Sequence, residues 1–142
     1  MPLIDVTVKP GYVFPEDQKH YAAPATAMYF VRRNFAPDLP ALFMANKSKF
    51  GLDATTPQEG VQVQIHTYDE FDVNVADLWV KVQLTEAPPR KAARLAICKA
   101  MHDALVALLH EFGYEVPNNF MLDVFWGPGH GCGTIDGTYT QW

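Results

Sequence analysis

The second residue of the chain, Pro2, can act as a base if it becomes the amino terminus. Methionine before a small residue is commonly removed, which leaves a secondary amine with a free lone pair. Apolar surroundings would lower the pKa of this amine from about 8, because they penalise its charged form. If Met1 stays, the Pro2 nitrogen is an amide and cannot take a proton. The structural alternative is that proline simply suits the first residue of a strand.

A second group of candidates, Arg90, Lys91 and Arg94, lies in the opening turns of the clearest predicted helix. Positive charge at this end of a helix opposes the helix dipole, and a bound anion would relieve the conflict. Arginine also binds a carboxylate through two parallel hydrogen bonds. The cluster indicates a carboxylate ligand at Arg90, whereas solvated surface charge is the favoured interpretation of Lys91 and Arg94.

Two further side chains could serve a substrate through hydrogen bonds. His66 lies on the polar side of a predicted strand, with Tyr68 on the same side, and its imidazole could polarise a substrate carbonyl. Tyr29 lies in the first predicted helix, where its hydroxyl could donate to an enolate. The alternatives are a structural hydrogen bond for His66, and packing beside Met28 and Phe30 for Tyr29.

The glycine-rich stretch "GPGHGCG" near the C-terminus suggests neither a nucleotide site nor a metal site. It lacks the Gly-Lys-Ser/Thr end of a phosphate-binding loop, and His130 with Cys132 supplies two ligands where zinc needs three or four. We therefore expect no metal and no organic cofactor. The tail 128–142 is interpreted as flexible or as wrapping another subunit.

Composition narrows the class of partner. Lys and Arg number 11 against 16 for Asp and Glu, and this net charge of -5 would repel a nucleic-acid backbone. No run approaches the roughly 20 apolar residues of a membrane span, and the start lacks a secretion signal. We expect a cytoplasmic protein that binds neither nucleic acid nor membrane. Cys98 is expected to pack within a helix, and a disulfide with Cys132 has no support.

Hydrophobic periodicity predicts the elements that must position these residues. Apolar residues alternate as in strands along four segments, which are 4–8, 61–65, 78–84 and 120–126. A helix is predicted over 88–112, with Pro88 and Pro89 in its first turn and Gly113 to end it. A weaker helix runs from about Pro15 or Glu16 toward Phe35, with a kink or late start at Pro24. The stretch 36–60 reads as a long connection, with a short helix around Leu42 to Ala45.

These elements form a weak internal repeat of strand, helix and strand. We predict a single α/β domain over 1–142, with halves at about 1–70 and 76–127 and the tail 128–142. Two β-α-β units would make a four-stranded sheet with two helices on one face. The other face of the sheet would be largely polar, and either solvated or lining the interior of an oligomer.

The Met-Pro start, the alternating strand and the second β-α-β half resemble the tautomerase superfamily. The stretches "VQVQIHTYDEF" and "LWVKVQLTEAPPRKAARLA" are most similar to 5-carboxymethyl-2-hydroxymuconate isomerase-like members, and less similar to cis-3-chloroacrylate dehalogenase-like members. The resemblance implies a MIF-like fold and a homotrimer. It also implies that Pro2 is the catalytic proline and that Arg90 falls near the arginine that binds a substrate carboxylate.

The chain departs from these members at several positions. Tyr29 stands where the dehalogenase-like members have a histidine, and Thr85 where they have an arginine. No counterpart of their water-activating glutamate is found in "FWGPGHGCGTIDG". Gln62 and Gln64 replace arginines expected from the isomerase-like members.

The resemblance implies a tautomerase that moves a proton on a small unsaturated 2-keto or 2-hydroxy acid. Pro2 would be the base, and Arg90, His66 and Tyr29 would bind the substrate. One alternative keeps this scaffold for a hydratase, dehalogenase or decarboxylase that acts on a small unsaturated acid. The other is a non-catalytic oligomeric binding protein, in which Met1 is retained.

Overall fold

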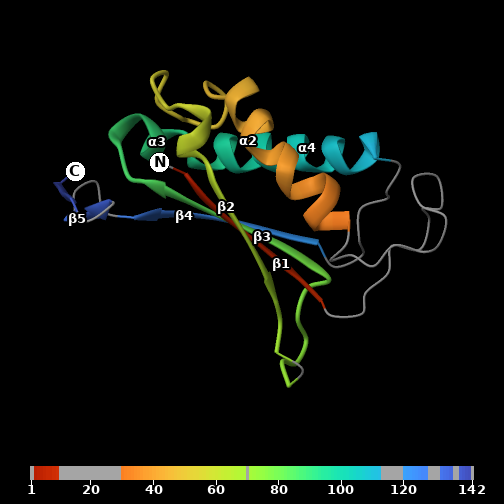
Figure 1. The fold of residues 1–142 in the computed structure, drawn as a ribbon. Helices are drawn as coiled ribbons and strands as arrows, with labels where there is room; N and C mark the ends of the chain where they lie inside the picture. Colours follow the sequence, from red (N-terminus) through yellow and green to blue (C-terminus); the bar gives the residue numbers. More distant parts are fainter. Residues whose placement is uncertain are drawn as a thin grey trace.

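Two β-α-β units join through their first strands in the computed structural model of this chain (Figure 1). The structure describes residues 2–9, 30–69, 71–112 and 120–127, and the backbone of 132–135 and 138–141. β1 (Leu3–Val8) is parallel to β2 (Gln62–Thr67), and β3 (Leu78–Thr85) is parallel to β4 (Phe120–Gly127). β1 and β3 are antiparallel, which gives the order β2-β1-β3-β4. The predicted four-stranded sheet is confirmed.

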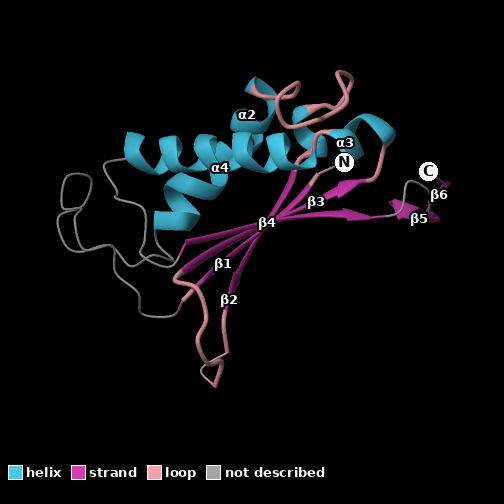
Figure 2. Ribbon diagram, turned by 180° about the vertical axis from the view of Figure 1, so that it is seen from behind, coloured by secondary structure: helices cyan, strands magenta, loops and turns pink. Residues whose placement is uncertain are grey.

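Alternation along the strands decides which face of the sheet meets the helices. Ile4 and Val6 of β1 and Val80 and Val82 of β3 are fully buried on one face. Helices α2 (Ala36–Ala45) and α4 (Arg94–Glu111) cover this same face (Figure 2). The helices contribute the rest of the core, chiefly Leu39, Phe43, Ile97, Met101, Leu105 and Leu109. None of the described helices is long and apolar enough to cross a membrane.

The helix predicted over 88–112 is in fact two helices. α3 (Pro88–Ala92) ends at Ala93, whose φ of -114° and ψ of 14° are not helical, and α4 begins at the next residue. The Ala93 N–H donates to the Arg90 carbonyl oxygen at 3.0 Å, which closes a tight turn between the helices. The periodicity of α4 is recovered, since Ile97 and Met101 point into the core.

The first-half helix was predicted to end near Phe35, and this is wrong. A π-helical turn, η1 (Val31–Phe35), continues directly into α2, so the supposed long connection is helical as far as Ala45. Proline lacks the N–H that continues a helix, but it is tolerated in a first turn, where Pro37 lies. A π-turn widens the helix just before it. The predicted start near Pro15 and the kink at Pro24 lie outside the described residues.

The tail pair of strands, two exposed apolar residues and one short helical turn have no counterpart in the predictions. β5 (Cys132–Ile135) and β6 (Thr138–Gln141) form an antiparallel pair in the tail, where no strand was expected. The outer face of the sheet, expected to be largely polar, also carries Met121 and Phe125 on β4, which are 41% and 49% exposed. A short helical turn, η2 (Gln58–Gly60), leads into β2.

Candidate active site

Pro2 lies buried at the start of β1, between the two flanking strands. Its carbonyl oxygen accepts a hydrogen bond of 3.1 Å from the Gln62 N–H on β2. On the other side Leu3 pairs with Gln83, so the antiparallel register places Pro2 beside Leu84 of β3. Pro2 alternates with Leu3 and therefore belongs to the same face as Ile4, which is the core face. Pro2 is therefore buried on the core face of the sheet, beside the buried Leu84.

Arg90 lies at the same end of the sheet as Pro2. Its Nε donates to the Gly51 carbonyl oxygen at 2.7 Å, and its NH1 donates to the Thr85 carbonyl oxygen in a short hydrogen bond. Thr85 directly follows Leu84, the register neighbour of Pro2. The fold therefore places Pro2 and Arg90 at the same end of the sheet, although they are far apart in the sequence. Two guanidinium nitrogens donate to backbone carbonyls, and the third, NH2, has no hydrogen-bond partner among the described residues.

Gly51 holds the loop that receives Arg90. Its φ is +68°, a left-handed conformation that glycine adopts without strain. A Cβ atom added here would come within 2.7 Å of Ile97 Cδ1, so the loop lies directly against α4. The glycine allows the loop to present its carbonyl oxygen to Arg90.

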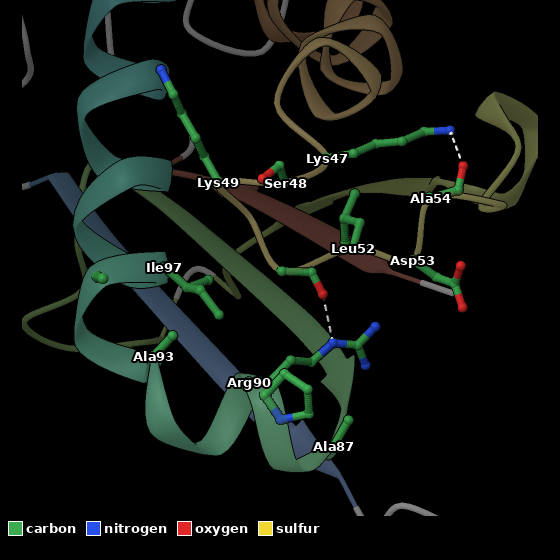
Figure 3. A pocket seen from close by; sticks show the side chains of 13 residues that line it. Lys47, Ser48, Lys49, Leu52, Asp53, Ala54, Ala87, Arg90, Ala93 and Ile97 are labelled. Carbon is green, nitrogen blue, oxygen red and sulfur yellow. Dashed lines mark hydrogen bonds between the residues drawn. The ribbon is translucent and has the colours of Figure 1, made fainter.

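A pocket of about 770 Å³ opens between this loop and the start of the second-half helices (Figure 3). Its apolar wall includes Leu52, Ala93 and Ile97. Its charged lining is Lys47, Lys49, Arg90 and Asp53. Figure 3 shows Lys47 and Lys49 extending in opposite directions from the loop, with the Lys47 ammonium donating to the Ala54 carbonyl oxygen at 3.1 Å. Three cations against one carboxylate make the pocket locally positive in a protein of net charge -5.

Asp53, the acidic residue in this lining, is stabilised in its ionised form. Hydrogen bonds from the Thr55 N–H at 3.0 Å and the Thr55 hydroxyl at 2.9 Å lower the pKa of the Asp53 carboxyl. The charges of Arg90 and Lys47 lower the same pKa further. Asp53 is therefore held ionised by its own loop, and its negative charge offsets part of the positive charge of Arg90 and Lys47.

A second cluster of polar side chains consists of Arg94, Glu86 and Trp126. Arg94 donates to Glu86 Oε2 in a short ion pair, and its guanidinium lies 5.3 Å from the centre of the Trp126 ring. Arg94 is exposed, as expected of a surface charge, and it also contacts these two side chains. Glu86 Oε1 and Trp126 Nε1 are both buried without a hydrogen-bond partner in the described part of the chain. An acceptor and a donor are thus left open near the same end of the sheet.

His66 lies elsewhere in the fold. It is on the outer face of β2, where its Nε2 is 3.1 Å from Asp5 Oδ1. His66 pairs in register with Thr7, five residues along β1 from Pro2, which is about 16 Å at the rise of a strand. Within one chain, His66 and Pro2 therefore lie on opposite faces and at opposite ends of β1. A role for His66 in substrate binding stays a prediction.

Tyr29, His130 and the Cys132 side chain lie outside the described residues. Cys98 is a free thiol and is half-buried on α4. In the described ranges, no group of three or more His, Cys, Asp and Glu side chains is arranged to hold a metal ion. Sequence reasoning missed Gly51 and the lysines beside it, because only tertiary packing places their loop against α3.

Several solved structures share this arrangement of strands and helices. A macrophage migration inhibitory factor-like protein from Entamoeba histolytica matches over 98% of both chains, with a TM-score of 0.53 and 12% identity. A fused 4-OT solved as a symmetric trimer matches with a TM-score of 0.52 and 19% identity, over 96% of this chain and 94% of that one. The chain has a tautomerase-like fold.

A third structure, Pt0534 inactivated by 2-oxo-3-pentynoate, has a TM-score of 0.54 and 15% identity, over 95% of this chain and 93% of that one. These comparisons confirm the tautomerase resemblance in the fold. No protein-family model and no curated protein sequence matches the chain.

Proposed function

We propose that this protein is a tautomerase that transfers a proton within a small unsaturated 2-keto or 2-hydroxy carboxylic acid. Pro2 is the base, and Arg90 binds the substrate carboxylate. The observation that carries the proposal is the position of a buried Pro2 at the sheet end where Arg90 donates to Thr85. A base and a cation at one site are what a keto-enol transfer of an acid requires.

The proposed reaction uses the lone pair of Pro2 after removal of Met1. Burial favours the uncharged amine, because a protonated amine loses solvation in apolar surroundings. The amine takes the proton of the enol hydroxyl. The protonated Pro2 then delivers a proton to the carbon at the other end of the enol double bond, which completes the keto acid. Arg90 holds the carboxylate and stabilises the negative charge that develops on the enolate. No metal or organic cofactor takes part in this proposal.

The pocket beside Arg90 supports an acidic substrate. Its cations attract an anion, while Leu52 and Ile97 supply an apolar wall for the carbon chain. Arg90 itself has two nitrogens committed to backbone carbonyls, so its contact with a substrate falls to NH2. Lys49 is exposed and lines the same pocket, and it adds charge beside this contact.

The direct test compares wild-type protein with the Pro2→Ala variant in the ketonisation of enol acids. Intact mass of both proteins establishes whether Met1 has been removed. We expect the wild-type mass to lack one methionine, and kcat of the variant to fall by about 100-fold or more, as for the loss of a general base. Circular dichroism verifies that the variant folds. Retained Met1 in an active protein, or full activity of the variant, would contradict the proposal.

A second candidate function is hydration or dehalogenation of an unsaturated acid, and the open oxygen of Glu86 favours it. Such a reaction needs a carboxylate to activate water, and Glu86 Oε1 is buried with no partner among the described residues. Arg94 holds the other oxygen and so fixes the orientation of the carboxylate. Assays of a 3-haloacrylate beside an enol acid separate the two functions. A Glu86→Gln variant that loses haloacrylate turnover but keeps ketonisation would assign Glu86 to the second.

We also propose that the protein assembles as a homotrimer and acts in the cytoplasm. The matched fused 4-OT is a symmetric trimer, and the outer face of the sheet offers apolar residues to another copy. A non-catalytic oligomeric binding protein is the remaining alternative, and it requires that Met1 be retained. The intact-mass measurement separates this alternative from the enzyme.

A further inference from the structure

Two polar atoms near the end of neighbouring strands are buried without a hydrogen-bond partner in the part of the chain that the structure describes. They are Oε1 of Glu86, just after β3, and Nε1 of Trp126 on β4. A buried polar atom in this state costs free energy, because it has given up water and gained no other partner. The two atoms therefore favour a ligand group that supplies both hydrogen bonds.

The sheet register places these two side chains together. Leu84 pairs with Trp126, and the Glu86 N–H donates to the Gly127 carbonyl oxygen at 2.9 Å, so the pairing of the two strands continues to this point. Because alternate residues share a face, Glu86 lies on the same face as Leu84 and Trp126. Arg94 contacts both side chains, since it pairs with Glu86 Oε2 and its guanidinium lies 5.3 Å from the Trp126 ring centre.

The two side chains lie at the Pro2 end of the sheet. Pro2 neighbours Leu84 on β3, and Leu84 neighbours Trp126 on β4, so the three form one row across the sheet. At about 4.8 Å per strand, the backbones of Pro2 and Trp126 are about 10 Å apart. Ala87, the residue after Glu86, lines the pocket of Figure 3. The Glu86 side chain is 25% exposed and Trp126 is half-buried, so a bound molecule can approach both.

The chemistry of the two atoms defines the group that would satisfy both. An indole N–H only donates, so its partner must accept. The Glu86 carboxylate, ion-paired with Arg94, only accepts, so its partner must donate. A hydroxyl or a carboxamide does both, whereas a carboxylate only accepts and an ammonium only donates. A second acid group would also be repelled by the charge of Glu86.

We propose that Glu86 and Trp126 form a subsite for a neutral hydrogen-bonding group of the substrate, a hydroxyl or a carboxamide. The substrate is then an acid with one carboxylate, which lies at Arg90, a reacting carbon at Pro2 and a neutral polar group at its far end. This inference rests on the proposed tautomerase function, and it gives Glu86 a binding role in place of water activation. Arg94 is a positioning residue, because it holds Oε2 of Glu86 and leaves Oε1 open.

The first test measures binding without turnover. Four saturated 2-hydroxy acids of one chain length, ending in a hydroxyl, a carboxamide, a methyl or a carboxylate group, cannot tautomerise, and calorimetry gives the Kd of each. We expect the wild-type protein to bind the first two at least about 10-fold more tightly than the others, because only they complete both hydrogen bonds. Equal Kd values, no binding of any of the acids, or tightest binding of the diacid would overturn the proposal.

The second test removes the donor of the subsite. Trp126→Phe deletes the indole N–H and keeps an aromatic ring, and we expect it to abolish the preference for hydroxyl and carboxamide over methyl. Trp79→Phe is the matched control, because the indole N–H of Trp79 donates to Asp123 on the outer face of the sheet. This control should keep the wild-type preference. A preference that survives Trp126→Phe would contradict the subsite.

The third test exchanges an acceptor for a donor. In Glu86→Gln, Arg94 donates and therefore selects the amide oxygen, so the amide NH2 group takes the position of Oε1. Two donors then face the ligand, and we expect the preference to change to the acid that ends in a carboxylate. Circular dichroism verifies that each variant folds. A folded Glu86→Gln variant with the wild-type preference would exclude Glu86 from the subsite.

The binding data also separate this inference from the proposed function. Ketonisation that depends on Pro2, in a protein with no preference among the four acids, would overturn the subsite alone. The expected preference in a protein that ketonises no enol acid would overturn the tautomerase proposal and leave a binding subsite at Glu86 and Trp126.

Discussion

The cationic side chains near the two ends of β1 have different kinds of hydrogen-bond partner. At the Pro2 end, Arg90 donates to the backbone carbonyls of Gly51 and Thr85, and the nearby Lys47 donates to a carbonyl as well. At the other end, cationic groups face carboxylates, as His66 does with Asp5 at 3.1 Å and Lys9 with Asp77 at 3.7 Å. A carbonyl orients a cation without neutralising it.

The kind of partner that each cation has indicates where an anion can bind. At the far end the charges are balanced by carboxylates, so an added anion would compete with them. At the Pro2 end, neutral carbonyl groups hold Arg90 and Lys47, although Asp53 lies close enough for both charges to lower its pKa, and Arg94 pairs with Glu86. Arg90 and Lys47 therefore offer positive charge to an anion at the end of the sheet where Pro2 lies.

Among the substitutions that test this comparison, the largest effect is expected from removing the cation at the Pro2 end. Arg90→Ala should raise KM for an enol acid by about 10- to 100-fold, because a charge-assisted hydrogen bond to the carboxylate is lost. Lys91→Ala is the matched control, since it removes an exposed cation one residue away. Steady-state kinetics of both variants measure the difference. Equal KM values for Arg90→Ala and wild type would contradict the inference that an anion binds at the Pro2 end of β1.

Gly51→Ala sharpens the comparison, because it disturbs the loop that positions Arg90. A side chain at a φ of +68° is strained, and its Cβ would meet Ile97 Cδ1. We expect a loss of about 1–3 kcal/mol in the free energy of unfolding, together with a higher KM. Ile97→Val removes the atom that clashes, so the cost of Gly51→Ala should shrink in that background. Strictly additive costs in urea denaturation would argue against this packing.

A smaller effect is expected at the far end of β1. His66→Ala should change kcat/KM by less than about threefold if each site is built from one chain, because His66 lies about 16 Å along β1 from Pro2 and on the opposite face. The measurement is the same enol-acid assay. A loss beyond tenfold would show that a second subunit brings its His66 to the Pro2 site.

The smallest effect concerns Asp53 and the pH dependence of stability. Its pKa is lowered in the folded protein, so its contribution is present above the unfolded pKa of about 3.9 and is lost as pH falls through the folded value. Asp53→Asn should therefore lower Tm slightly at pH 7 and have no effect at a pH below the folded pKa. Thermal melts at both pH values test the sign. A larger difference in Tm between Asp53→Asn and wild type at low pH than at pH 7 would contradict the lowered pKa of Asp53.

The sequence predicted the sheet well because each strand signals its buried face locally. Ile4 and Val6, and Val80 and Val82, alternate with polar residues, and burial follows this alternation. The helix of the first half was placed poorly, because 36–60 was interpreted as a connection with a short helix around Leu42 to Ala45, whereas α2 already begins at Ala36. Only the tertiary structure shows that α2 begins at Ala36 and packs Leu39 and Phe43 against the sheet. Local propensity is overridden there by burial.

The sequence names candidate site residues only where one residue carries its own signal. Pro2 and Arg90 are candidates because of the Met-Pro start and the basic residues at a helix start, and both stay predictions. Gly51 and Glu86 were missed, since their significance depends on an Ile97 methyl group and on Arg94, which lie far away or on another element. Spacing in the sequence does not report such contacts.

The most direct measurement of the central claim is covalent trapping of Pro2. An amine with a free lone pair adds to the conjugated triple bond of 2-oxo-3-pentynoate, forming a carbon–nitrogen bond while its proton moves to the neighbouring carbon. Mass spectrometry at neutral pH should find one added reagent per chain, and peptide mapping should locate it on an amino-terminal Pro2. A chain that still carries Met1, or that leaves Pro2 unmodified, would contradict the account.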